Sequence, residues 1–76
     1  MKKTIYSANY KKLTKWLKAS REEKELSMRD LAEILDVSHS WVGKIEQGER
    51  RLDVLEYMKL CKALGIDACK GLNLLK

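Results

Sequence analysis

The sequence contains no proline and no phenylalanine, and it has only four glycines among its 76 residues. An all-β domain needs runs of β-branched residues separated by turns rich in glycine and proline. No part of this chain follows that pattern, so we predict an all-α fold. A chain of this length folds as one domain, residues 1–76, close to the lower size limit for folding on a hydrophobic core.

Few side chains are available for catalysis or metal binding. The two cysteines, Cys61 and Cys69, form no CxxC motif, and the one histidine, His39, is far from them in the sequence. Their spacing favours a buried thiol at Cys61 and a free thiol at Cys69, both of which suit a reducing cytoplasm. A glycine-rich phosphate loop is also absent. We therefore expect no enzyme activity, no metal and no cofactor.

Long hydrophobic runs are absent as well. No stretch approaches the roughly 18 uncharged apolar residues that predict a membrane span. Residues 1–10 are basic but have neither an apolar segment nor a small-residue cleavage site, so they do not have the pattern of a secretory signal. These features predict a cytoplasmic protein that does not cross a membrane.

The positive charge lies at one end of the chain. Residues 1–26 account for the whole net charge of +5, with eight lysines and arginines against three glutamates, whereas residues 27–76 carry eight charges of each sign. Such a patch favours a polyanion, either nucleic acid or an anionic membrane surface. The membrane is the weaker choice, because the domain must bury the opposite face of the same helix. The simplest alternative is a solvated face that only keeps the protein soluble.

Apolar spacing and capping residues predict five helices. After an arm over residues 1–6, the predicted ranges are 7–24, 28–35, 38–47, 53–64 and 67–75. Ser7, Ser27, Ser38, Asp53 and Asp67 each lie at or just before the start of a predicted helix and can accept a hydrogen bond from a first-turn N–H. Ser27 with Asp30 and Asp53 with Glu56 also have the spacing of capping boxes.

The fourth predicted helix has an apolar stripe that we expect to be buried. Its residues are Val54, Leu55, Met58, Cys61 and Leu64. Gly48 and Gly65 follow the third and fourth helices and can adopt the left-handed conformation that ends a helix.

The two central helices suggest a function. Helices over 28–35 and 38–47 with a short turn between them form a helix-turn-helix, whose second helix fits the major groove of DNA. At about 100° per residue, Val42, Ile45 and Glu46 share one side of that second helix. The opposite side carries groups suited to reading base edges: His39, Ser40, Gly43, Lys44 and Gln47.

These residues carry a family resemblance. The run LSMRDLAEILDVSHSWVGKIEQGERRLDVLEYMKLCKALGID resembles the phage-repressor-like (Cro-type, xenobiotic-response-element) helix-turn-helix domains, in particular their small stand-alone bacterial members. The resemblance covers residues 13–68 and implies a five-helix, lambda-repressor-like DNA-binding domain. This sequence departs from the family pattern at Met28, where a phosphate-binding glutamine is usual, and at Asp36, where the turn usually has glycine. Aspartate tolerates the left-handed conformation better than most residues, so we expect the turn to form.

The resemblance also implies roles for single residues. It assigns base contacts to four residues of the second central helix: His39, Ser40, Gly43 and Lys44. Arg21 and Glu46 fall where the family often has a buried ion pair, which would fix how that helix is held.

Phosphate contacts are expected at the N-termini of the two central helices, where free N–H groups and the helix dipole favour an anion. The candidates there are Ser27, Met28, Arg29 and Ser38, with Arg29 partly replacing the missing glutamine. Trp41 either reaches a phosphate through its indole N–H or is partly buried against the preceding helix. Arg50 and Arg51 in the following loop either contact phosphates or are merely solvated.

The resulting hypothesis is a sequence-specific regulator of transcription that binds double-stranded DNA, most simply a repressor that occludes a promoter. One alternative is an antitoxin-like protein that binds a toxin partner and its own promoter. Another alternative is a controller of a restriction-modification operon, which differs from the first hypothesis only in its genomic neighbours.

A dimer is expected, because one recognition helix covers few base pairs and two copies about 34 Å apart would read a palindromic operator. Symmetric homodimers are also the commonest oligomers. The predicted contact lies in the last helix: Ala68, Leu72, Leu74 and Leu75. These residues offer more apolar area than one helical turn can bury in a monomer. Alternatively, the leucines fold back onto the first and fourth helices and complete the core.

Overall fold

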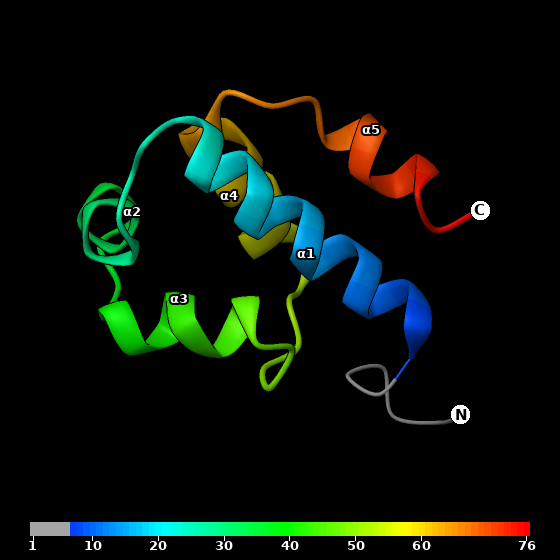
Figure 1. The fold of residues 1–76 in the computed structure, drawn as a ribbon, viewed down its shortest axis with the longest axis horizontal. Helices are drawn as coiled ribbons and strands as arrows, with labels where there is room; N and C mark the ends of the chain where they lie inside the picture. Colours follow the sequence, from blue (N-terminus) through cyan, green and yellow to red (C-terminus); the bar gives the residue numbers. More distant parts are fainter. Residues whose placement is uncertain (1–6) are drawn as a thin grey trace.

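The computed structural model describes residues 7–76 and contains five α-helices and no strand within that range (Figure 1). Their bounds are α1 Ala8–Glu23, α2 Met28–Leu35, α3 His39–Glu46, α4 Val54–Leu64 and α5 Ala68–Asn73. The predicted all-α, five-helix fold is confirmed. The expected arm over residues 1–6 lies outside the described residues. α5 ends at Asn73 rather than at residue 75.

The helices begin after the capping residues identified in the sequence. The Ser27 side chain accepts from the Asp30 N–H at 3.0 Å, and the Asp30 carboxylate accepts from the Ser27 N–H at 2.9 Å. Asp53 and Glu56 form the same reciprocal pair at α4. Because these bonds satisfy first-turn donors that have no partner within the helix, they fix where the helices start.

Left-handed residues make the turns between helices. Asp36 ends α2 with φ 58° and ψ 48°, the conformation for which glycine is usual, so the aspartate does support the tight turn into α3. Gly48 and Gly65, with φ 75° and 65°, follow α3 and α4 as predicted.

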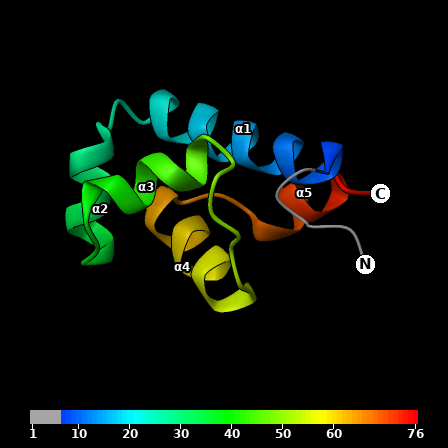
Figure 2. The same cartoon turned by 90° about the horizontal axis from the view of Figure 1, so that it is seen from below.

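The core lies between α1 and α4. α2 and α3 close it at one end, and α5 packs against both α1 and α4 at the other (Figures 1 and 2). The largest fully buried side chains come from α2, α3 and α4: Leu31, Val42, Ile45 and Leu64. Each side chain contributes about 1.5–3 kcal/mol by leaving water. Val42 and Ile45, the two that belong to α3, therefore hold this helix against the others. The opposite side of α3 is thereby held outward.

The stripe predicted on α4 is wrong in part. Val54, Leu55 and Met58 are 76%, 72% and 51% exposed, and the buried face consists of Tyr57, Leu60, Cys61 and Leu64. α4 has apolar residues around most of its circumference, so spacing alone allowed more than one buried face. The Tyr57 hydroxyl helps to select the face, because it donates to the carbonyl of Ala68 at 2.5 Å and so joins α4 to α5.

Candidate nucleic-acid interface

One side of α3 presents the groups predicted to read bases. On the core side, Val42 and Ile45 are only 1% and 2% exposed. On the other side, the exposed residues are His39, Ser40, Lys44 and Gln47, and Gly43 between them is partly exposed. Figure 2 shows α3 and the segment that follows it in front of the rest of the molecule. The structure therefore brings the five predicted residues onto one open helix face, whose donors and acceptors match those on base edges.

Gly43 is not required by the packing of the protein. A Cβ atom at this position would lie 3.7 Å from the Met28 sulfur, an ordinary van der Waals contact, with no other atom as near. A glycine within a helix costs about 1 kcal/mol relative to alanine. Because the fold does not need this glycine, its place on the open face suggests that a ligand approaches the backbone closely there.

The N-terminus of α2 has two N–H groups free to bind an anion. The N–H groups of Ser27 and Asp30 are taken by the capping box, so those of Met28 and Arg29 remain without an acceptor in the helix. The hydrogen bond from the Ser27 N–H lowers the pKa of the Asp30 carboxyl. Ser27 itself can offer only its hydroxyl, and the Met28 thioether has no hydrogen to donate. At Met28 an anion would therefore bind the backbone.

The N-terminus of α3 has the same arrangement. The Ser38 hydroxyl accepts from the Trp41 N–H at 3.2 Å and also lies 3.2 Å from the Ser40 hydroxyl. The N–H groups of His39 and Ser40 have no acceptor inside the helix. Together with the helix dipole, the two N-termini offer separate positions suited to phosphate oxygens.

A buried ion pair fixes α3 to α1. The Arg21 Nε lies 2.6 Å from Glu46 Oε2, and its Nη2 donates to Oε1 at 3.0 Å. The Arg21 Nη1 donates to the Leu26 carbonyl at 2.6 Å. The two side chains are only 9% and 4% exposed, and the bonds to Glu46 raise the pKa of Arg21. The pair therefore holds the recognition helix at a fixed angle to α1.

The comparisons with known proteins decide the family. The model of a helix-turn-helix family matches residues 17–70, which is most of the chain. The chain belongs to the XRE-type helix-turn-helix family. None of the curated proteins matches it.

Solved structures of XRE-type regulators share the fold. An XRE-family like protein from Pseudomonas syringae pv. tomato str. DC3000 is 38% identical, with a TM-score of 0.84 over 95% of this chain and 88% of that one. The restriction-modification controller protein C.AhdI from Aeromonas hydrophila is 31% identical, with a TM-score of 0.79 over 86% of this chain and 98% of that one. The clp gene regulator ClgR from Corynebacterium glutamicum is 25% identical, with a TM-score of 0.81 over 91% of this chain and 73% of that one. These similarities support a DNA-binding transcription regulator, a class that is generally not enzymatic.

The loop after the recognition helix places its two arginines differently. The guanidinium carbon of Arg50 lies 5.7 Å from the ring centre of the half-buried Trp41, and its Nη2 pairs with Glu56 at 3.1 Å. Arg51 is exposed and forms no ion pair within residues 7–76. Arg51 is therefore the freer of the two for a phosphate in this XRE-type domain.

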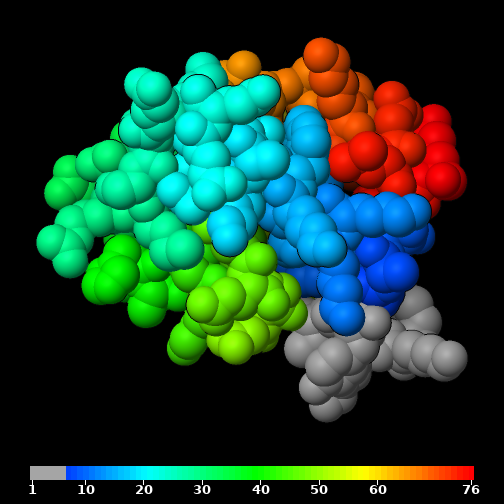
Figure 3. Space-filling view, in the orientation of Figure 1, coloured from blue at the N-terminus to red at the C-terminus, as the bar shows by residue number. Residues whose placement is uncertain are grey.

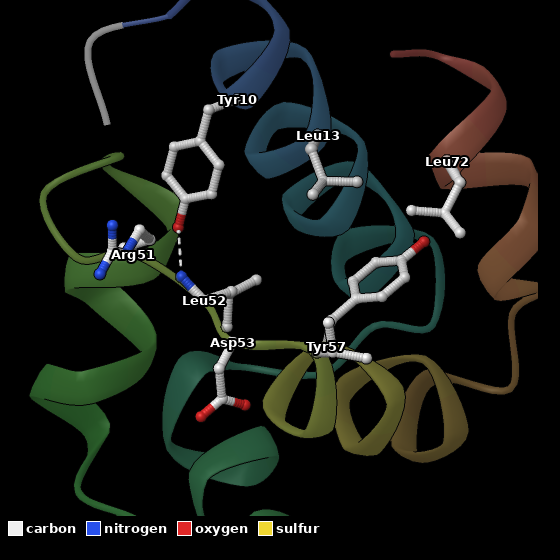
Figure 4. Close-up of a pocket in the computed structure, with 8 residues that line it drawn as sticks. Tyr10, Leu13, Arg51, Leu52, Asp53, Tyr57 and Leu72 are labelled. Carbon is white, nitrogen blue, oxygen red and sulfur yellow. Dashed lines mark hydrogen bonds between the residues drawn. The ribbon is translucent and has the colours of Figure 1, made fainter. Parts of the chain in front are cut away.

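Tyr10 has a role that the sequence interpretation missed. Its hydroxyl donates to the carbonyl of Arg50. The same hydroxyl accepts from the Leu52 N–H at 3.0 Å, the bond drawn in Figure 4. Burial raises the pKa of the hydroxyl, which stays protonated. The only signal in the sequence is that Tyr10, Leu13 and Leu17 recur at helical spacing, which puts Tyr10 on the core face of the first helix. Through this side chain, α1 holds the loop that carries Arg50 and Arg51.

The sequence interpretation predicted only the α5 part of an apolar surface to which α4 also contributes. Leu72 and Leu74 are 48% and 39% exposed, whereas Ala68 and Leu75 are partly buried against the core. Leu72 lies across a hollow of about 280 Å³ from the start of α4 (Figure 4). We call the exposed residues of both helices the α4–α5 surface: Val54, Leu55, Met58, Leu72 and Leu74.

The remaining expectations concern cysteines, metals and membranes. Cys61 is buried and Cys69 is exposed, and both are free, as predicted. Burial raises the pKa of the Cys61 thiol. Residues 7–76 contain no cluster of three or more side chains suited to a metal ion. None of the helices in that range is long and apolar enough to cross a membrane.

Proposed function

We propose that this protein is a repressor that binds a palindromic DNA operator as a homodimer. The observation that carries the proposal is the open face of α3, where polar side chains flank a glycine that the packing does not require. In the proposed complex this face enters the major groove. Lys44 and His39 donate to guanine, Gln47 pairs with adenine, and Ser40 contacts either. Gly43 allows the helix to approach a base or a thymine methyl.

Phosphate contacts would hold the recognition helix in register without reading sequence. At α2 they come from the backbone N–H groups of Met28 and Arg29, with the Ser27 hydroxyl and the Arg29 side chain beside them. At α3 they come from its first N–H groups and the Ser38 hydroxyl. Arg51 adds a contact from the loop. Arg50 and Trp41, which lie against each other, form the edge of this surface, where the indole N–H is a further donor.

The second copy would pack on the α4–α5 surface. This surface includes Leu72 and Leu74 of the residues first predicted, and the side chains exposed on α4 enlarge it. Ala68 and Leu75, half-buried beneath it, support the contact rather than form its centre. Exposed apolar patches on small proteins usually mark contacts. Because no residue of this surface belongs to α2 or α3, a dimer leaves both recognition helices free.

The test begins with selection of a preferred site from random DNA, followed by affinity measurements with single variants. Lys44→Ala should weaken binding to that site by about 1–3 kcal/mol and relax the choice at one base position. Lys59→Ala, which removes the same charge from the exposed side of α4, is the control and should bind as the parent does. If Lys44→Ala weakens binding to all sequences equally, Lys44 contacts phosphate and the assignment is wrong.

Dimerisation is tested separately by the mass of the protein in solution. Leu55→Asp places a charge on the α4–α5 surface and should convert a dimeric parent into a folded monomer. A parent that stays monomeric at high micromolar concentration would refute this part of the proposal.

A second candidate is a controller of a restriction-modification operon. It is favoured by the 31% identity to C.AhdI, a controller protein of which nearly the whole length is covered. The two functions use the same surfaces and differ in the operon that is regulated. Binding of the protein to DNA upstream of adjacent restriction and modification genes would select this candidate, and the absence of such genes would exclude it.

A further inference from the structure

Four exposed lysines on α1 have no role in the site described above. They are Lys11, Lys12, Lys15 and Lys18. None of them forms an ion pair with another residue of the described range 7–76. The part of α1 that carries them therefore presents concentrated, unneutralised positive charge, and its position relative to α3 decides what it can bind.

Contacts to neighbouring segments define two sides of α1. Arg21 pairs with Glu46 of α3, and Tyr10 bonds to the loop after α3, so these residues mark the α3 side. On the other side, Asn9 donates to the Leu75 carbonyl at 3.3 Å. The Trp16 ring on this side lies close to Gly71 of α5, since a Cβ atom added to Gly71 would be 2.5 Å from the ring. These contacts mark the α5 side.

Two of the four lysines lie on the α3 side, and a third lies beside them. At about 100° per residue, Lys18 and Lys11 lie about 60° and 80° round the helix from Arg21, away from the core. Lys15 lies about 120° from Arg21 and about 100° from Trp16, so it faces outward between the two sides. Lys12 instead lies about 40° from Trp16, towards α5. We call Lys11, Lys15 and Lys18 the lysine row. Figure 3 shows α1, in blue to cyan, uncovered across the front of the molecule beside the segment that follows α3.

The dimensions of the row fit a DNA backbone. α1 has 16 residues and α3 has eight, so α1 is about 24 Å long and extends well beyond the roughly 12 Å recognition helix. The row spans about 10 Å, the axial length of about three phosphates along one strand. Because Arg21 and Tyr10 fix α1 to α3 and to the following loop, the row keeps its place relative to the face that reads bases.

We propose that the lysine row binds the phosphates of the same duplex beyond the base pairs read by α3, which extends the footprint of the protein along the DNA. This inference rests on the proposed function, because it places the duplex against α3. Its contacts supply affinity and salt dependence but no choice of sequence, since phosphates are the same at every base pair.

The test compares two triple variants that remove the same charge. One replaces Lys11, Lys15 and Lys18 by Gln, and the matched control replaces Lys12, Lys59 and Lys62, which are also exposed, by Gln. Affinity is measured against salt on a long duplex with the selected site at its centre and on a duplex cut at the ends of that site. Thermal melting of both variants verifies that each remains folded.

On the long duplex, the row variant should lose about 0.9 from the log–log salt slope for each phosphate contact removed, or roughly 2–3 in total. The control should keep nearly the parental slope, and on the short duplex all three proteins should behave alike. The ratio of affinities for selected and scrambled sites should not change. An unchanged slope for the row variant, or an equal loss in both variants, would overturn the proposal. A parent that shows no preference between those sites would instead refute the proposed function.

Discussion

Two halves of the molecule differ in how completely they bury their apolar side chains. One half consists of α2 and α3, and the other consists of α4 and α5. In the first half, the residues facing the core are buried and the outer face of the recognition helix is polar, and one large apolar side chain, Ile34 of α2, is exposed. In the second half, five large apolar side chains of the α4–α5 surface remain exposed. Both halves belong to the same small domain and share one core.

The difference follows from how many faces of each helix are apolar. α3 has one apolar side, so it has one way to pack and its polar side necessarily faces outward. α4 has apolar residues on nearly every side, so burying one face against α1, α2 and α5 leaves another uncovered. We infer that the first half is specified for contact with a polar ligand, and that the second half retains apolar area suited to another copy of the chain.

The largest expected effect tests the two faces of α4 directly. Leu60 is 2% exposed and Leu55 is 72% exposed, although both are leucines of the same helix. Leu60→Asp should destabilise the fold by more than about 4 kcal/mol, because it buries a charge without a partner. Leu55→Asp should stay within about 0.5 kcal/mol of the parent when both are monomeric. Denaturant unfolding at low protein concentration measures both. Similar losses for the two variants would show that α4 buries a different face.

The next effect concerns the ion pair that holds the recognition helix. Glu46→Ala leaves the Arg21 guanidinium buried without its partner and should destabilise by about 3–5 kcal/mol. Glu49→Ala, an exposed carboxylate in the loop that follows, is the control and should have little effect. Thermal melting compares the two. A Glu46→Ala protein that melts near the parental temperature would show that the pair does not hold the two helices together.

The smallest effect comes from the two glycines that lie inside helices, one in each half. A Cβ at Gly71 would lie 2.5 Å from the Trp16 ring and also too close to the Tyr57 hydroxyl, so Gly71→Ala must displace α5. We expect a loss of about 1–3 kcal/mol from this overpacking. Gly43→Ala meets only Met28 at 3.7 Å and should stabilise the fold by up to about 1 kcal/mol.

Chemical denaturation gives the sign of both changes. If Gly43→Ala is more stable but binds the selected DNA less well, the glycine serves the interface rather than the fold. If both variants lose stability equally, the proposed difference between the two halves is wrong at these positions.

The sequence by itself determined the helices, their capping residues and the polar face of α3. Capping and amphipathic spacing act between residues a few positions apart, so they can be identified from Ser27 and Asp30, or from Val42 and Ile45, without knowledge of the rest of the chain. The left-handed turn at Asp36 was expected because the family usually has glycine there and aspartate tolerates that conformation. The pairing of Arg21 with Glu46 was expected only because the sequence resembles a family in which such a pair is common.

Only the tertiary structure decided which face of α4 is buried and what Tyr10 does. Both depend on groups distant in sequence: the carbonyl of Ala68, to which Tyr57 donates, and the loop atoms of Arg50 and Leu52, which the Tyr10 hydroxyl bonds. When several faces of a helix are apolar, each gains a similar free energy by leaving water. The choice among them then rests on shape and on a few polar contacts, and those exist only once the helices have come together.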